Sequence, residues 1–198
     1  ICESLELRDS DRLVEIGTGW GGMAIYAAKH HGCHVTTTTI SRQQHELASA
    51  RIQAEGLQDR VTLLLSDYRE LEGRFDKLVS IEMIEAIGHQ FQDTYFEKCA
   101  SLLAPGGRAL IQAITIEDHR YRQALDSVDF IKRHIFPGSY IPCVSSMVES
   151  AARAGAHTGA ARVASVARNT ARVLGIRTVT ARGYGRPGAP ARMLPAAA

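Results

Sequence analysis

The chain has 198 residues, 45% of them hydrophobic and 22% charged, which is the composition of a soluble folded domain. No apolar run approaches the roughly 20 residues that a membrane-spanning helix needs, and no secretory signal is visible at the start. The four cysteines form no C-x-x-C pair, which predicts free thiols in a reducing compartment. His30, His31 and His34 lie close together, but no second ligand cluster follows them, so we predict no metal site.

The net charge of +2 hides an uneven distribution along the chain. After Glu149 there are eight arginines and no Asp or Glu, so residues 1–150 carry 15 basic and 21 acidic residues. This shift predicts one domain over residues 1–155 and an Ala/Arg/Gly/Pro-rich tail over residues 156–198. Because the tail has too few apolar residues to enclose a core, we expect it to be largely disordered, or helix-prone with little to pack against.

The first predicted unit is a strand followed by a glycine turn and a helix. Leu13, Val14 and Ile16 form a short apolar run that predicts a buried strand, and the apolar residues 23–28 predict a helix. The glycines between them permit a sharp turn and let a ligand lie against bare amides at the helix N-terminus. This pattern indicates a ligand site, although an ordinary tight turn between strand and helix would also fit it.

The following residues alternate between the two element types. Ser41 is a good N-cap for a helix that runs to about Glu55, where Gly56 ends it. Further strands are predicted over residues 33–40, 61–65, 75–81 and 108–116, and further helices over residues 91–103, 121–135 and 145–154. The alternation predicts an α/β fold with a doubly wound, Rossmann-like parallel sheet, in which ligands bind at the carboxyl ends of the strands.

Two classes of cofactor use such a glycine turn. Gly17, Gly19 and Gly22 fit the G-x-G-x-x-G pattern of dinucleotide binding, which is a weak signal alone. A nicotinamide enzyme also needs an acidic residue about 20 positions further on, and the second predicted strand ends in Thr-Thr-Thr-Thr-Ile, without an acid. An acid stands instead inside the first strand, at Glu15. The segment Glu-Ile-Gly-Thr-Gly-Trp-Gly resembles the first motif of class I S-adenosylmethionine (SAM) methyltransferases.

Up to about Gly155 the chain resembles one family of that class. This family comprises the cyclopropane-fatty-acyl-phospholipid synthases and the related fatty-acid and mycolic-acid methyltransferases. The resemblance rests on residues 14–22, 39–44, 66–69, 75–85, 93–96, 103–107, 112–116 and 130–138. Two of these segments, Glu-Met-Ile-Glu at 82–85 and Phe-Ile-Lys-Arg-His-Ile-Phe-Pro-Gly at 130–138, are not general methyltransferase features, which makes the match specific.

The resemblance implies which residues hold the cofactor. The family holds the ribose with a Thr-Ile-Ser-x-x-Gln segment, here Thr39, Ile40 and Gln44, in place of the usual acid after the second strand. Tyr68 and Arg69 fall where the family places adenine contacts. The expected SAM-binding residues are Glu15, Gly17, Thr18, Gly19, Gly21, Thr39, Ile40, Gln44, Tyr68, Arg69 and Ile81.

The implied reaction is methyl transfer from SAM to the double bond of an unsaturated acyl chain, followed by loss of a proton. Family members hold a bicarbonate ion as the base, with a glutamate, a histidine, a tyrosine, a cysteine and backbone groups. The glutamate matches Glu85. Gln112 stands at the histidine position and cannot carry charge, so we expect an altered anion site. The cysteine position would precede Ile1, and the tyrosine position would fall in the tail, where the resemblance has ended.

The remaining expectations concern the ends of the chain and its surroundings. We expect an N-terminally truncated or processed fragment that lacks or improvises the last two strands of the usual seven-stranded sheet, as a frameshift would cause. The expected partners are unsaturated phospholipid acyl chains at the membrane surface, with no specific nucleic acid. The expected location is cytoplasmic, peripheral to the inner face of the membrane. Three alternatives remain: a methyl-branched product, another small-molecule acceptor, and a non-catalytic SAM-binding module.

Overall fold

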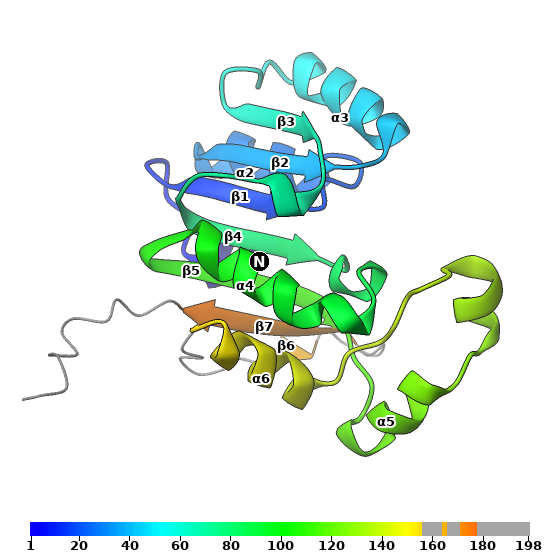
Figure 1. Cartoon of the computed structure of the whole chain (residues 1–198). Helices are drawn as coiled ribbons and strands as arrows, with labels where there is room; N and C mark the ends of the chain where they lie inside the picture. The colour runs from blue at the N-terminus through cyan, green and yellow to red at the C-terminus, as the bar shows by residue number, and fades with distance from the viewer. Residues whose placement is uncertain (156–163, 166–170, 178–198) are drawn as a thin grey trace, which may run out of the picture.

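A computed structural model of the chain describes residues 1–155, 164–165 and 171–177. Its centre is a sheet with the strand order β3-β2-β1-β4-β5-β7-β6 (Figure 1). The parallel strands are β1 (Arg12–Ile16), β2 (His34–Thr39), β3 (Val61–Leu65), β4 (Phe75–Ile81) and β5 (Leu103–Ile114). The strand order reverses between β1 and β4, which is the switch point of a doubly wound sheet. The predicted fold class is therefore confirmed.

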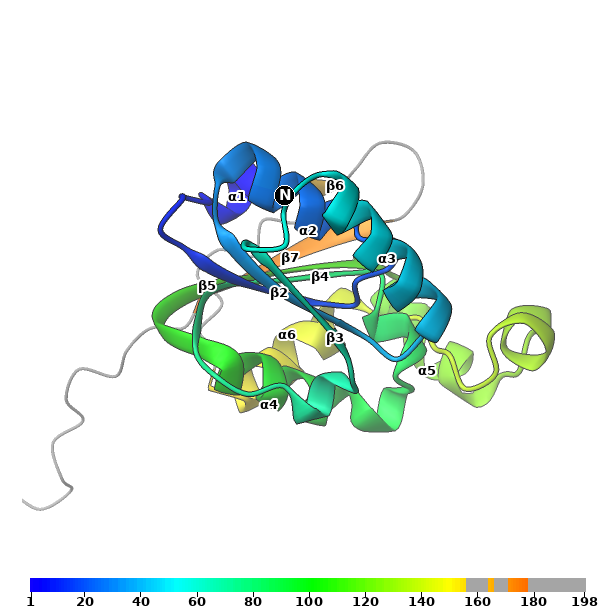
Figure 2. The ribbon, with the colours of Figure 1, turned by 90° about the horizontal axis from the view of Figure 1, so that it is seen from above.

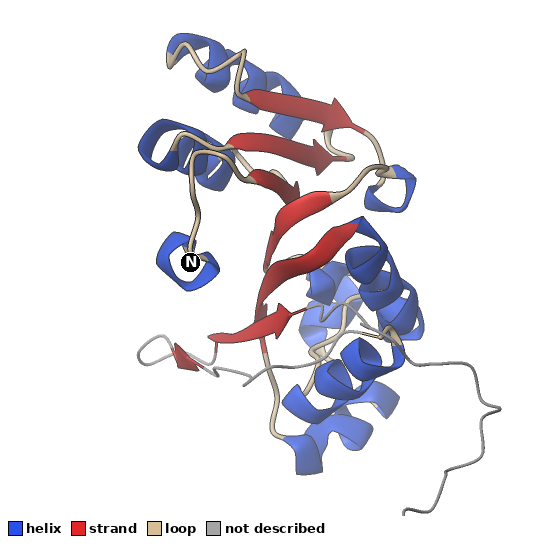
Figure 3. Ribbon diagram, turned by 90° about the vertical axis from the view of Figure 1, so that its left-hand side faces the viewer, coloured by secondary structure: helices blue, strands red, loops and turns tan. Residues whose placement is uncertain are grey.

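Helices cover both faces of this twisted sheet (Figures 2 and 3). The helices on one face are α1 (Cys2–Leu5), α2 (Gly22–His31) and α3 (Arg42–Ala54), and those on the other are α4 (Gln92–Leu102) and α6 (Val144–Arg153). Neighbouring strand residues point to opposite faces. Leu13 accordingly packs in the hydrophobic cluster of α2, whereas Val14 packs with Tyr95 and Phe96 of α4, and all four are buried. Burial on both faces explains the apolar run of β1.

Most element boundaries agree with the sequence prediction to within a few residues. The hydroxyl of Ser41 accepts a hydrogen bond from the amide of Gln44 at 3.3 Å and caps α3 as expected. The single helix predicted over residues 121–135 is wrong. The chain forms α5 (Asp118–Asp126) and then a short π-helical turn, η4 (Ile131–Ile135), which begins after Asp129 accepts a bond from the amide of Lys132. No residue of either piece is buried, so no packing favours one continuous helix.

The expectation that the sheet lacks its last strands is also corrected. β7 (Ala171–Arg177) pairs antiparallel with β5, from Arg108 opposite Arg177 to Ile114 opposite Ala171. β6 (Ala164–Ser165) pairs with β7 in turn. Without β7, the backbone amides and carbonyls along the edge of β5 would have no hydrogen-bond partners in the sheet. Pairing with β7 supplies these partners. The remainder of the predicted tail, residues 156–163, 166–170 and 178–198, lies outside the described residues.

In the described part of the chain, no helix has both the length and the apolar content that crossing a membrane requires. The four cysteines are all free and buried.

Candidate functional site

The glycine turn after β1 has a backbone that other residues adopt only with strain. Gly17 has a φ of 95° and Gly19 a φ of 51°. A Cβ at Gly17 would lie 3.2 Å from Cγ of Met83, whereas a Cβ at Gly19 would meet no atom within 4 Å. Gly17 is thus favoured by its φ and by the close Met83 side chain, and Gly19 leaves free space for a ligand beside the N-terminus of α2.

A buried polar chain holds this turn from behind. The hydroxyl of Thr37 donates to Oε2 of Glu15 at 2.7 Å and lies 2.7 Å from the hydroxyl of Thr18. The amide of Thr18 donates to the carbonyl of Thr38 at 2.9 Å. Burial raises the pKa of Glu15 to about 8, although the bond from Thr37 opposes this shift. Glu15 and Thr18 therefore shape the turn and do not themselves line the cavity in front of it, and Gly21 caps α2.

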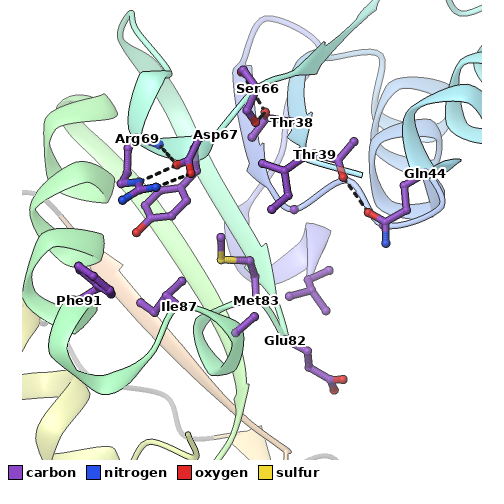
Figure 4. Close-up of a pocket in the computed structure, with 16 residues that line it drawn as sticks. Thr38, Thr39, Gln44, Ser66, Asp67, Arg69, Glu82, Met83, Ile87 and Phe91 are labelled. Atoms are coloured by element: carbon purple, nitrogen blue, oxygen red, sulfur yellow. Dashed lines mark hydrogen bonds and ion pairs between the residues drawn. The ribbon is translucent and has the colours of Figure 1, made fainter. Parts of the chain in front are cut away.

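A cavity of about 470 Å³ opens in front of the turn, at the carboxyl ends of the parallel strands (Figure 4). Its size lies in the range of small-molecule and cofactor sites. Eight of the eleven predicted SAM-binding residues line it: Gly17, Gly19, Thr39, Ile40, Gln44, Tyr68, Arg69 and Ile81. The structure thus brings together residues that are spread over more than sixty positions of the sequence.

One wall of the cavity comes from the end of β2 and the start of α3. The hydroxyl of Thr39 donates to Oε1 of Gln44 at 2.7 Å, which fixes the side-chain amide of Gln44 (Figure 4). The side-chain NH₂ group of Gln44 makes no hydrogen bond among the described residues and can donate to a ligand, and its oxygen keeps one further lone pair. Ile40 lies at the rim, with 78% of its surface exposed.

The opposite wall is formed by η1 (Tyr68–Glu70). Tyr68 is buried, its ring meets that of Tyr95 edge-on at 5.7 Å, and burial raises the pKa of its hydroxyl. Asp67 caps η1 and accepts two bonds from the guanidinium of Arg69, at 2.9 and 2.7 Å (Figure 4). This pairing lowers the pKa of the Asp67 carboxyl. The wall therefore presents an aromatic side chain beside a fixed ion pair.

Eight further residues line the cavity that the sequence did not single out as binding residues: Thr38, Ser66, Asp67, Glu82, Met83, Ala86, Ile87 and Phe91. Glu82 is notable among them because its φ of 50° lies in the left-handed region. Its amide donates to the carbonyl of Gln112 at 2.8 Å, and its Oε1 accepts a bond from Nε2 of Gln112 at 3.2 Å. Two signals were available: Glu82 directly follows a predicted strand, and it begins the Glu-Met-Ile-Glu segment of the resemblance, but neither marks it as a binding residue.

The two predicted catalytic residues lie at the ends of β4 and β5, next to the cavity and not in its lining. Glu85 belongs to η2 (Ile84–Ala86), and its Oε1 accepts a bond from the amide of Ile114 at 2.5 Å. Its Oε2 is buried and has no hydrogen-bond partner among the described residues. Burial raises the pKa of Glu85, and the nearby Glu82 adds to this effect. The side chain of Gln112 is hydrogen-bonded to Glu82, whereas that of Glu85 is bonded to the backbone of Ile114. The two predicted catalytic residues therefore share no polar partner.

Glycine turn, cavity and sheet together give the chain the fold of the class I SAM-dependent methyltransferases. Within residues 1–155, 164–165 and 171–177, no three His, Cys, Asp or Glu side chains gather into a group that could hold a metal ion. The chain belongs to the mycolic acid cyclopropane synthetase family, whose model matches residues 1–174.

Curated relatives and solved structures agree with this assignment. The chain is 39% identical to the tuberculostearic acid methyltransferase UfaA1 of Mycobacterium tuberculosis, over 77% of this chain and 35% of that protein. It is 38% identical to the cyclopropane-fatty-acyl-phospholipid synthase of Escherichia coli K12, over 76% of this chain and 37% of that protein. The chain thus spans little more than a third of these relatives.

The fold is also that of the mycolic acid cyclopropane synthase CmaA1, solved in complex with SAH and CTAB. The TM-score is 0.70 at 24% identity, covering 80% of this chain and 59% of that one. The cyclopropane synthase MmaA2 of M. tuberculosis gives a TM-score of 0.71 at 24% identity, with 80% and 59% coverage.

Proposed function

We propose that this chain is the cofactor-binding part of an enzyme that transfers a methyl carbon from SAM to the double bond of an unsaturated acyl chain of a phospholipid. The observation that carries the proposal is the position of Glu85 and Gln112, at the ends of the two strands beside the cavity. Two relatives support the lipid acceptor by their names: the tuberculostearic acid methyltransferase, at 39% identity, and the cyclopropane-fatty-acyl-phospholipid synthase, at 38%.

The residues of the cavity fit SAM. The open space at Gly19 admits a ligand against the backbone, and the free NH₂ group of Gln44 suits a ribose hydroxyl. Tyr68 supplies an aromatic surface for the adenine ring. When bound, SAM supplies an electrophilic methyl group, which a weakly nucleophilic double bond requires. The protein then has to hold the double bond in line with that group and keep water away.

Product formation releases a proton from the substrate, and we assign Glu85, in η2 beside the cavity, to the site that accepts it. Burial raises the pKa of Glu85, which makes its carboxylate a stronger proton acceptor than an exposed glutamate. The orphaned Oε2 fits a ligand that carries a hydroxyl donor, such as bicarbonate, which we propose as a base held by Glu85. Because the amide of Gln112 already donates to Glu82, it contributes less to an anion than a histidine would.

A methylene product is the second candidate, or a methyl-branched one once a separate hydride donor has reduced the methylene group, and Gln112 is the observation that favours it. An uncharged amide at the position of the family's histidine binds an anion less strongly. The bound anion is the base that removes the proton when the ring closes. The name of the relative UfaA1, tuberculostearic acid methyltransferase, agrees with such a product. We also propose a cytoplasmic location at the inner face of the membrane, because that is where a phospholipid acceptor can be reached.

The test is transfer of labelled methyl from SAM to lipid vesicles that differ only in acyl-chain unsaturation. We expect label in the unsaturated lipid alone, and product analysis by mass spectrometry to separate ring, methyl and methylene forms. Glu85→Gln should lose transfer and keep SAM binding, whereas Glu46→Gln, on the exposed surface of α3, should keep both. Label in saturated lipid, or transfer unaffected by Glu85→Gln, would overturn the proposal.

A further inference from the structure

Glu82 is a charged residue of the cavity to which the proposed reaction gives no role. It follows β4 directly and has a φ of 50°, a conformation that a residue with a side chain adopts only at a cost in free energy. Such strain persists only where the surrounding contacts impose it, and it is concentrated at active sites and ligand-binding sites. The conformation of Glu82 therefore points to a role for its carboxylate in this cavity.

Two hydrogen bonds join Glu82 to the end of β5. Its amide donates to the carbonyl of Gln112 at 2.8 Å, and its Oε1 accepts a bond from Nε2 of Gln112 at 3.2 Å. The same residue thus holds both the backbone and the side chain of Glu82. Because Glu82 also lines the cavity, its carboxylate connects the wall of the cofactor space to a predicted catalytic residue.

The charges around the cavity are unbalanced. Among the described residues, three charged side chains line it: Asp67, Arg69 and Glu82. Asp67 and Arg69 neutralise each other in an ion pair at 2.7 Å, whereas Glu82 forms no ion pair within 4.0 Å in the described part of the chain. The charge of Glu82 also adds to the effect of burial in raising the pKa of Glu85. The excess of one negative charge favours a positively charged ligand.

The position of Glu82 matches the sulfonium end of SAM. Figure 4 shows Glu82 apart from both Arg69 and Gln44. The proposed function places the adenine ring at η1 and the ribose at Gln44. The sulfur of SAM is bonded to the 5′ carbon of the ribose, and its methyl group has to face the site of Glu85. The positively charged sulfur is therefore assigned to the end of β4, which Glu82 follows.

We propose that Glu82 selects the positively charged SAM over S-adenosylhomocysteine (SAH), whose sulfur is neutral. Both molecules carry the same ammonium and carboxylate groups, so the charge of the sulfur is what Glu82 can distinguish. In methyl transfer the π electron pair of the double bond forms the bond to the methyl carbon, and the pair of the S–CH₃ bond stays on sulfur. The positive charge passes to the acyl chain and leaves it with the proton. The attraction to Glu82 is then lost, which favours release of SAH. This inference rests on the proposed function for its cofactor.

The experiment is calorimetric titration of the full chain with SAM and with SAH, which gives the ratio of the two dissociation constants without turnover. We expect the wild type to bind SAM more tightly, and Glu82→Gln to lower this preference about tenfold, since an exposed carboxylate attracts a cation only moderately. The glutamine keeps an oxygen that can accept the bond from Gln112, so this variant changes the charge and not the contact.

Two further variants separate charge from position. Glu82→Gly removes the carboxylate and its bond to Gln112 and should lower the preference for SAM to the same extent as Glu82→Gln. The matched control is Glu46→Gln, which removes one carboxylate from the exposed surface of α3 and should keep the ratio of the wild type. A SAM analogue with a protonated amine on carbon in place of the sulfonium should follow SAM and bind Glu82→Gln about tenfold more weakly than the wild type.

Four results would overturn the proposal. They are a ratio that Glu82→Gln leaves unchanged, a preference that is lost only in Glu82→Gly, an equal loss in Glu46→Gln, and an amine analogue that behaves as SAH does. A failure of the proposed function would look different. A wild type that is folded by circular dichroism but binds neither SAM nor SAH would reject the cofactor itself. A wild type that shows the expected ratio but transfers no methyl group to lipid would reject the acceptor and support the role of Glu82.

Discussion

Replacing the buried Glu15 by glutamine should remove a large pH dependence from the stability of the chain. Burial raises the pKa of Glu15 from 4.5 to about 8 in the folded state. Between these values the folded chain keeps a proton that the unfolded chain has lost, so stability is highest at low pH and falls as the pH rises. The slope is about 1.4 kcal/mol per pH unit, and the whole interval amounts to about 5 kcal/mol. A glutamine keeps the shape and can still accept the bond from Thr37.

Urea unfolding followed by circular dichroism at pH 5, 6, 7 and 8 measures this effect. As the pH rises, the free energy of unfolding of Glu15→Gln should increase relative to that of the wild type by about 1.4 kcal/mol with each unit of pH. Glu46→Gln is the matched control, because that carboxylate lies in water on α3 and its curve should run parallel to that of the wild type. Parallel curves for Glu15→Gln and the wild type would refute the claim that Glu15 is buried in its neutral form.

Two further substitutions test the local geometry. Glu82→Gly should raise the free energy of unfolding by about 0.5–1 kcal/mol in urea titrations, because a φ of 50° is strained for any residue with a side chain; a loss of stability would contradict the left-handed conformation. Gln92→Leu should lower it by about 2–4 kcal/mol, because the buried Gln92 donates to the carbonyl of Ser146 and accepts from the hydroxyl of Tyr140, both of which would lose a partner. A change below about 0.5 kcal/mol would show that α4 and α6 do not depend on this network.

The parts of the fold that local sequence determines were predictable. The strand before Gly17 and the helix after Ser41 follow from apolar periodicity and from a capping residue, and both signals act within a few positions. The break between α5 and η4 was not predictable in this way, because it depends on the absence of packing around residues 127–130 and not on a strong stop signal. The pairing of β7 with β5 depends equally on an edge that only the assembled sheet provides.

The residues of the site also divide into those that the sequence could predict and those that it could not. Gly19, Gln44 and Tyr68 were found because a motif or a family resemblance pointed to them, and the cavity contains all three. The hydrogen bond from Thr39 to Gln44 could not be predicted, since it depends on the rotamers of two side chains. Glu82 was missed because a left-handed glutamate has no signature in the sequence.

The central claim is that the cavity in front of the glycine turn binds SAM, and calorimetric titration of the purified chain tests it most directly. A valine at Gly19 would combine a β-branched side chain with a φ of 51° and place methyl groups in the ligand space, whereas Gly22, the first residue of α2, has free space and no left-handed φ. The account predicts saturable SAM binding by the wild type and by Gly22→Ala, and affinity about tenfold or more weaker in Gly19→Val. A folded wild type that binds no SAM, or a Gly19→Val variant that binds it equally well, would contradict the account.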